Sequence, residues 1–148
     1  MNYQTETFDQ VIDEIKPLLE ANHREICASP GLLKLAPDYE SYKALEDAGV
    51  LFVFTARKEG ALVGYVVVIN TPNLHHKDVK FSIADTIYIK PEYRGSINGL
   101  KLLEFTKGQL KLNGVDYLTV HMNTDNLFAG LLKHLKFRQI EEVWGAEL

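Results

Sequence analysis

The fold is decided by the stretch Ile87-Tyr88-Ile89-Lys90-Pro91-Glu92-Tyr93-Arg94-Gly95-Ser96-Ile97-Asn98-Gly99-Leu100. It reads as an apolar strand, a turn that contains glycine, and the start of a helix. A helix start presents unpaired N–H groups and the positive end of the helix dipole, so the turn can hold a phosphate or pyrophosphate. Gly95 and Gly99 would let a ligand approach the main chain, and Arg94 adds a positive charge. The same pattern also occurs as a tight connection without a ligand, so both interpretations stay open.

Upstream of this turn, apolar and polar or small residues alternate over 81–89, which predicts a long strand that stops at Pro91. Asp85 falls on the apolar side of the alternation. A β-bulge would re-aim its side chain toward a cleft. Without a bulge, Asp85 is a strand-edge carboxylate bonded to the backbone or to a lysine.

The remaining elements follow from apolar spacing and from turn residues. We expect helices over 8–26, 38–49, 97–112 and 125–136, and strands over 50–55, 62–69, 117–122 and 137–144. Pro17 should kink or divide the first helix, and two helices precede any strand. This order predicts an α/β (mixed α+β) fold of three layers. Its single mixed sheet, antiparallel first and then parallel, has helices on both faces.

Length and composition indicate one globular domain over residues 1–148, with 46% hydrophobic and 24% charged residues. No apolar run reaches the roughly 18 to 20 residues of a membrane span, and residues 2–7 do not resemble an export signal. Cys27 is the only cysteine, which excludes an intrachain disulfide and a multi-cysteine zinc site. We therefore expect a soluble, cytoplasmic protein, either a monomer or a homodimer.

The charge is unevenly distributed along the chain. Residues 1–50 hold ten acidic and four basic residues, whereas residues 51–148 hold ten acidic and twelve basic ones. No Lys/Arg cluster of the kind that binds nucleic acid is present. The acidic half either steers a cationic ligand or forms the solvated face of surface helices.

The stretch around Arg94 resembles the acetyl-CoA motif of the GNAT superfamily of N-acetyltransferases, which is Arg or Gln, two residues, Gly, one residue, then Gly or Ala. Arg94 and Gly99 match its first and last positions, 91–95 matches the usual lead-in, and Ile97 replaces the middle glycine. The predicted order of elements also matches the family over nearly the whole chain. Asn126, Ala129 and Phe137 echo its closing pattern, with Lys136 where a glycine usually stands.

Within the superfamily the chain is most similar to the GNAT-like proteins of tailed phages, which would place it in the host cytoplasm. That impression is carried by His23 with Glu25, 37–42, Ala56-Arg57 before Gly60, Gly64-Tyr65, His75-His76 and Asp85 before Pro91–Gly95.

The GNAT resemblance implies acetyl-CoA as co-substrate and an amine as acceptor, either a small molecule or a protein lysine or N-terminus. It implies a cofactor site formed by Ile87, Tyr88, Ile89, Arg94, Gly95, Ser96, Ile97, Asn98, Gly99, Leu100 and Asn126. Ile97 in the loop also leaves open a GNAT-fold binding protein without turnover.

Acetyl transfer needs a base for the amine and an acid for the leaving thiolate. Asp85 is our candidate base, because partial desolvation between Ile83 and Ile87 would raise its pKa. Leu132, or Lys133 if the register shifts, stands where many family members carry a tyrosine acid. Tyr88 is the candidate replacement, although a packed strand tyrosine is the alternative.

Other reactive residue types carry weaker signals. His121 could relay protons or be structural. His75-His76 lacks the further ligands of a metal site, and we expect none. Cys27 reads as a buried thiol rather than a nucleophile.

Overall fold

The structure of the protein is a computed structural model that describes residues 1–27, 29, 31–122 and 128–147. Its elements, in chain order, are β1 (Asn2–Glu6), α1 (Phe8–Ile26), α2 (Tyr39–Asp47), β2 (Leu51–Lys58), β3 (Ala61–Thr71), β4 (Phe81–Ile89), a 3-10 turn (Pro91–Tyr93), α3 (Asn98–Leu112), β5 (Tyr117–Val120) and α4 (Ala129–His134). Within the described residues, no helix combines the length and apolar character needed to cross a membrane.

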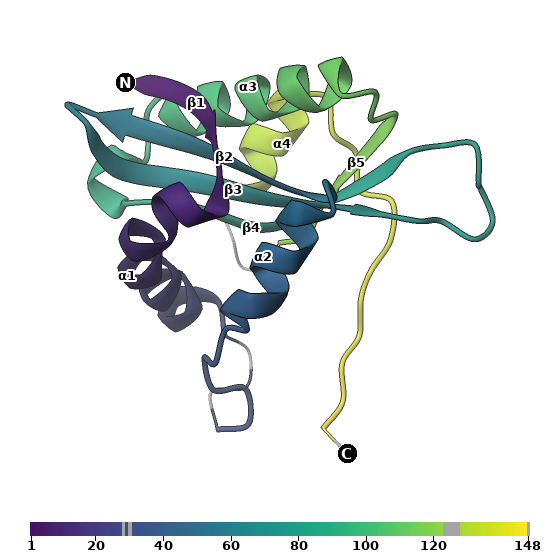
Figure 1. The fold of residues 1–148 in the computed structure, drawn as a ribbon, viewed down its shortest axis with the longest axis horizontal. Coiled ribbons are helices and arrows are strands. Elements are labelled where there is room, and N and C mark those ends of the chain that lie inside the picture. The colour runs from purple at the N-terminus through teal and green to yellow at the C-terminus, as the bar shows by residue number, and fades with distance from the viewer. Residues whose placement is uncertain (28, 30, 123–127, 148) are drawn as a thin grey trace.

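The five strands form one sheet in the order β1-β2-β3-β4-β5. The first three pairings are antiparallel, and β4 pairs with β5 in parallel. Helices α1 and α2 cover one face, and α3 and α4 cover the other (Figure 1). The predicted three-layer mixed α/β fold is confirmed.

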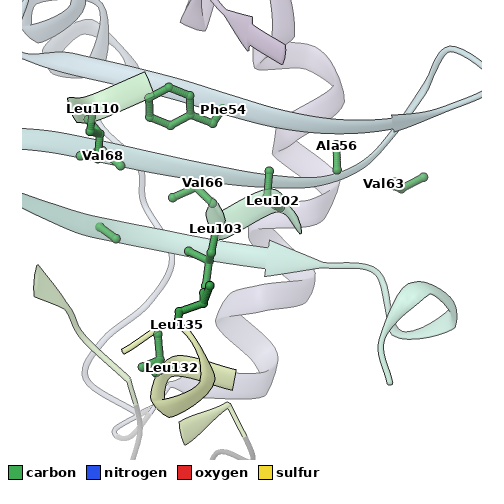
Figure 2. Packing of buried hydrophobic residues seen from close by; sticks show 11 residues of the cluster. Phe54, Ala56, Val63, Val66, Val68, Leu102, Leu103, Leu110, Leu132 and Leu135 are labelled. Carbon is green, nitrogen blue, oxygen red and sulfur yellow. The ribbon is translucent and has the colours of Figure 1, made fainter. Parts of the chain in front are cut away.

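Each face of the sheet has its own core. On the α3 and α4 side, Leu102, Leu103, Leu132 and Leu135 pack onto β2 and β3 (Figure 2). On the α1 and α2 side, apolar residues of α1 meet the opposite faces of the same strands. Each fully buried leucine contributes roughly 1.5–3 kcal/mol, so these two layers hold both pairs of helices to the sheet.

Short polar signals set the element ends. Thr7 and Gln10 form a capping box at the start of α1, and Asp38 caps α2 by accepting from the Ser41 N–H at 3.0 Å. Glu59 and Gly60, both with positive φ, form the two-residue turn of the β2-β3 hairpin.

Strand β1 contradicts the expectation that two helices precede any strand. Its sequence is polar, so it carries little strand signal of its own. Pairing with β2 holds it in place, together with Arg57, which contacts Glu6 at 2.9 Å and Glu14 at 2.7 Å.

Although burial alone raises the pKa of Glu6, hydrogen bonds from Arg57 and Thr55 lower it below its ordinary value. The stability from this pair is therefore present above the unfolded-state pKa and is lost as pH falls through the lowered one.

Two further expectations need correction. Of the two effects expected of Pro17, division of α1 does not occur: the helix continues through Pro17, because its buried apolar stripe holds both halves against the sheet. The expected strand over 137–144 is not formed, and residues 138–147 leave the sheet as an extended segment (Figure 1). Glu141-Glu142 interrupts its alternation, and Trp144 is 88% exposed.

The turn that follows α4 contains a lysine, Lys136, in a conformation that favours glycine. Lys136 has a φ of 64°. The Phe137 N–H donates to Leu132 O at 2.9 Å and the Lys136 N–H to Lys133 O at 3.0 Å, which is the Schellman pattern. The missing family glycine is therefore replaced without losing the turn, at the cost of left-handed strain.

We predict that Lys136→Gly stabilises the protein by about 0.5–1 kcal/mol, because glycine relieves this strain. Lys133→Gly removes the same charge from a helical position and should destabilise by about 1 kcal/mol. Urea unfolding of both variants measures the difference. Destabilisation by both would contradict the strained turn.

Candidate functional site

Strand β4 contains the β-bulge that the sequence left open. Val67 pairs with Thr86 and Val68 with Ala84, so Asp85 is the additional residue. Before the bulge Ala84 faces the α3 core, and after it Ile87 and Ile89 do so. The bulge therefore turns Thr86 and Tyr88 toward the α1 and α2 side and leaves Asp85 exposed.

Beyond the bulge, β4 parts from β5. The parallel pairing joins Phe81–Ala84 to Tyr117–Val120, whereas β3 stays paired with β4 as far as Ile89. Among the described residues, the β5-side edge of 85–89 has no strand partner. Backbone N–H and C=O groups on that edge can bond an extended ligand as a further strand would.

The turn after β4 leads directly to the start of α3. Gly95 has a φ of 68°, a conformation that other residues rarely adopt. The Asn98 N–H donates to Ser96 Oγ at 3.4 Å, and Ile97 provides no side-chain cap. The Gly99 and Leu100 N–H groups, which have no partner within the helix, are therefore placed to bind an anion.

Ile97 does not distort this turn. Its φ of −68° is ordinary for an L-residue, and its side chain is 54% exposed. Gly99 is closely packed: a Cβ there would lie 3.3 Å from Leu131 Cδ1, which would have to shift by a few tenths of an ångström, and 3.6 Å from Ile89 Cδ1, which is an ordinary contact. The closing glycine thus suits the packing of α3 against α4.

Arg94 is engaged with the protein itself. Its Nε donates to Ile89 O at 2.7 Å, its Nη2 lies 2.9 Å from a Glu25 carboxylate oxygen, and its guanidinium lies 5.2 Å from the centre of the Tyr88 ring. Arg94 therefore ties the turn to the end of β4 and to α1, and a phosphate would have to compete with Glu25 for its charge.

The acidic and phenolic groups of the site lie on the α1 and α2 side. Thr86 Oγ1 donates to an Asp85 carboxylate oxygen at 3.1 Å. Burial and then the negative charge of Asp85 raise the pKa of Tyr42. Burial, followed by the charge of Glu25, raises the pKa of Tyr88 against the opposing charge of Arg94, so Tyr88 is protonated at neutral pH.

Tyr42 was missed as a site residue by sequence reasoning, and Glu25 was noted there without a contact to Arg94 or Tyr88. They come from α2 and α1, about 40 and 55 positions before β4, and no local pattern links them to it. A pocket of about 340 Å³ opens beside Tyr42, between α1, residues 33–37 and Thr86.

The other candidates lie apart from this site or have structural contacts. Cys27 is half-buried at the end of α1, with its thiol 3.5 Å from Leu33 O. Leu132 is buried in the α4 core. His121 is exposed after β5, and Asn126 lies outside the described residues.

The His75-His76 pair also has a structural neighbour. His76 stacks on Phe81 with their ring centres 6.1 Å apart. Within the described part of the chain, no group of three or more His, Cys, Asp or Glu side chains is placed to hold a metal ion.

Comparisons with known proteins agree with this geometry. Residues 12–137 match the model of the acetyltransferase (GNAT) family. A search of curated protein sequences gave no match.

Solved structures with the same fold span nearly the whole chain. A ribosomal-protein-alanine N-acetyltransferase from Brucella melitensis biovar Abortus 2308 has a TM-score of 0.72 and 16% identity, with 100% of both chains covered. An aminoglycoside acetyltransferase from an uncultured soil metagenomic sample, in complex with sisomicin, has a TM-score of 0.74 and 14% identity over 99% of this chain and 96% of that one. Aminoglycoside N-acetyltransferase AAC(6')-Iy in complex with CoA has a TM-score of 0.74 and 11% identity over 99% and 98%.

We predict that Gly64→Ala destabilises the protein by about 1–3 kcal/mol. A Cβ at Gly64 would lie 2.7 Å from Ile89 Cγ1 and 2.9 Å from the Tyr88 carbonyl oxygen, so β4 would have to move. The control is Gly108→Ala, in an open position within α3, which should stabilise by about 0.5–1 kcal/mol. Chemical denaturation of both variants tests the close approach of β3 and β4, and equal effects of one sign would contradict it.

Proposed function

The chain belongs to the acetyltransferase (GNAT) family, and on that premise we propose that it transfers an acetyl group from acetyl-CoA to a primary amine. The observation that carries the proposal is the open edge of β4 beside the uncapped start of α3. This combination offers strand-like hydrogen bonds for an extended ligand and a positive helix end for its phosphates.

In this proposal the pantetheine arm of acetyl-CoA lies along Ile87–Ile89, and the pyrophosphate lies at the turn 94–100. The Gly99 and Leu100 N–H groups bind phosphate oxygens directly, with Gly95 and Ser96 shaping the turn. Arg94 holds the turn and adds charge. Asn126 remains a candidate contact from the family resemblance.

The chemistry follows from the backbone edge of β4 and from side chains on its α1 and α2 side. The acceptor nitrogen attacks the thioester carbonyl carbon while the C–S bond breaks, and a backbone N–H of Ile87–Ile89 polarises the carbonyl oxygen. Asp85, brought to the α1 and α2 side by the bulge, takes the proton that the amine loses. Tyr88, protonated at neutral pH, is the proposed donor to the leaving thiolate.

The identity of the acceptor amine is less constrained than the identity of the acetyl donor. The similar structures include enzymes described as acting on ribosomal-protein alanine and on aminoglycosides, at 11–16% identity. Both a small amine and a protein lysine or N-terminus therefore remain within the proposal. The likeness to tailed-phage proteins, a monomer or homodimer, and a reducing cytoplasm, which suits a lone Cys27, stay predictions.

We predict that Ile97→Glu weakens acetyl-CoA binding about tenfold, because a carboxylate beside the start of α3 repels phosphate. Acidic residues favour a helix start, so loss of folding is not the expected cause. Leu112→Glu, at the other end of α3, is the control and should bind normally. Calorimetric titration with acetyl-CoA measures both, and equal affinities would place the cofactor elsewhere.

Asp85→Asn should lower kcat by about 100-fold and leave acetyl-CoA affinity unchanged, because the amide cannot accept the amine proton. Asp78→Asn, in the loop before β4, is the control. Thiol release from acetyl-CoA with an amine panel gives the rate. Unchanged turnover in Asp85→Asn would remove Asp85 from the base role.

The second candidate, a GNAT-fold binding protein without turnover, is favoured by Leu132, which is buried where many family members carry the acid. It predicts stabilisation by acetyl-CoA without thiol release from any amine. At 100 times Kd, ligand should raise the unfolding free energy by about 2.7 kcal/mol in either case. Turnover therefore separates the two functions.

A further inference from the structure

The pocket beside the bulge has an unusual composition for a site that receives an amine. It lies between the second half of α1, the segment 33–37 and the side chains of Tyr42 and Thr86, and its volume of about 340 Å³ suits a small molecule. Its lining consists of apolar and neutral polar residues together with His23 and Lys34. No carboxylate is among these residues, whereas Lys34 carries a positive charge.

Large aliphatic side chains are left in water around this pocket. Leu33 is 54% exposed and Leu35 is 37% exposed, on the segment that forms one wall. Leu19 reaches the pocket from α1 and is also part of the α1 core. An apolar ligand would cover these side chains and remove their surface from water, which is favourable.

The carboxylates of residues 1–50 do not compensate for the lack of a carboxylate in the pocket lining. Eight of the ten in residues 1–50 already have a hydrogen-bond or ion-pair partner: Glu6, Asp9, Asp13, Glu14, Glu25, Asp38, Glu46 and Asp47. They cap helices or neutralise Lys16, Lys43, Arg57 and Arg94. These contacts favour the solvated-helix interpretation of the charge over the steering of a cationic ligand.

The pocket connects directly to the proposed chemistry. Thr86 lines it and donates to Asp85, and Tyr42 lines it while its pKa responds to the Asp85 charge. A ligand body held between Leu33 and Tyr42 would thus present a short amine arm at Asp85. One negative group at the mouth and an apolar interior fit one amino group on an apolar body.

We infer that the acceptor is a monoamine carried on a compact apolar body, such as an arylalkyl or branched alkyl group, rather than a polyamine or polycation. The inference rests on the proposed acetyl transfer for its chemistry, but it concerns binding in this pocket. Leu33, Leu35 and Tyr42 are the specificity residues, and Lys34 disfavours a second positive charge.

The test compares 2-phenylethylamine with 1,4-diaminobutane. Acetylation is followed by thiol release from acetyl-CoA, and binding by saturation-transfer NMR on the protein with CoA. We expect kcat/KM for phenylethylamine to exceed that for the diamine at least tenfold. Leu33→Asp should lower it about tenfold and shift the preference toward the diamine, whereas Leu74→Asp, at a 92% exposed position in the β3-β4 loop, should change neither rate.

The outcomes separate this inference from the proposed function. If phenylethylamine binds, Leu33→Asp abolishes that binding and no thiol is released, the apolar pocket is supported and acetyl transfer is contradicted. If thiol release is faster with the diamine, or Leu33→Asp leaves the preference unchanged, the inference is overturned while acetyl transfer stands. A folded protein that binds and acetylates neither amine also overturns it.

Discussion

The additional residue in β4 is the constraint on which the candidate site depends. With a regular alternation, Ala84 and Thr86 would share the α3 face, and Tyr88 would follow them into that core. The bulge at Asp85 instead gives Ile87 and Ile89 to the α3 side and Thr86 and Tyr88 to the α1 side. It lies where β4 loses its pairing with β5. One local irregularity thus exposes a carboxylate at the point where the strand edge opens.

The two core layers hold this geometry from both sides. Gly64 lets β3 approach the end of β4, so the strand is fixed where a ligand would bind. Arg94 adds a polar tie between the Ile89 carbonyl and Glu25 of α1. The cofactor side and the acceptor side of the proposed reaction are therefore connected through the last residues of β4.

Local sequence signals predicted most of the fold. Capping residues such as Asp38, the Glu59-Gly60 turn and the alternation over 81–89 act within a few positions, and their elements are confirmed. The predictions for the residues of β1 and for the segment after Phe137 were wrong, because strand pairing depends on a distant partner rather than on local pattern. For the same reason the sequence suggested Asp85 and the turn at Arg94, but not the apposition of Tyr42, Glu25 and Leu33.

In the proposed function, the edge of β4 and the start of α3 together bind acetyl-CoA. Amide chemical shifts of the isotope-labelled protein, recorded while CoA is added, test it most directly. We expect the largest changes at the Gly95, Gly99 and Leu100 amides, smaller changes over 86–89, and none at Gly49 or Gly114. Saturable binding with unchanged Gly99 and Leu100 signals would contradict it.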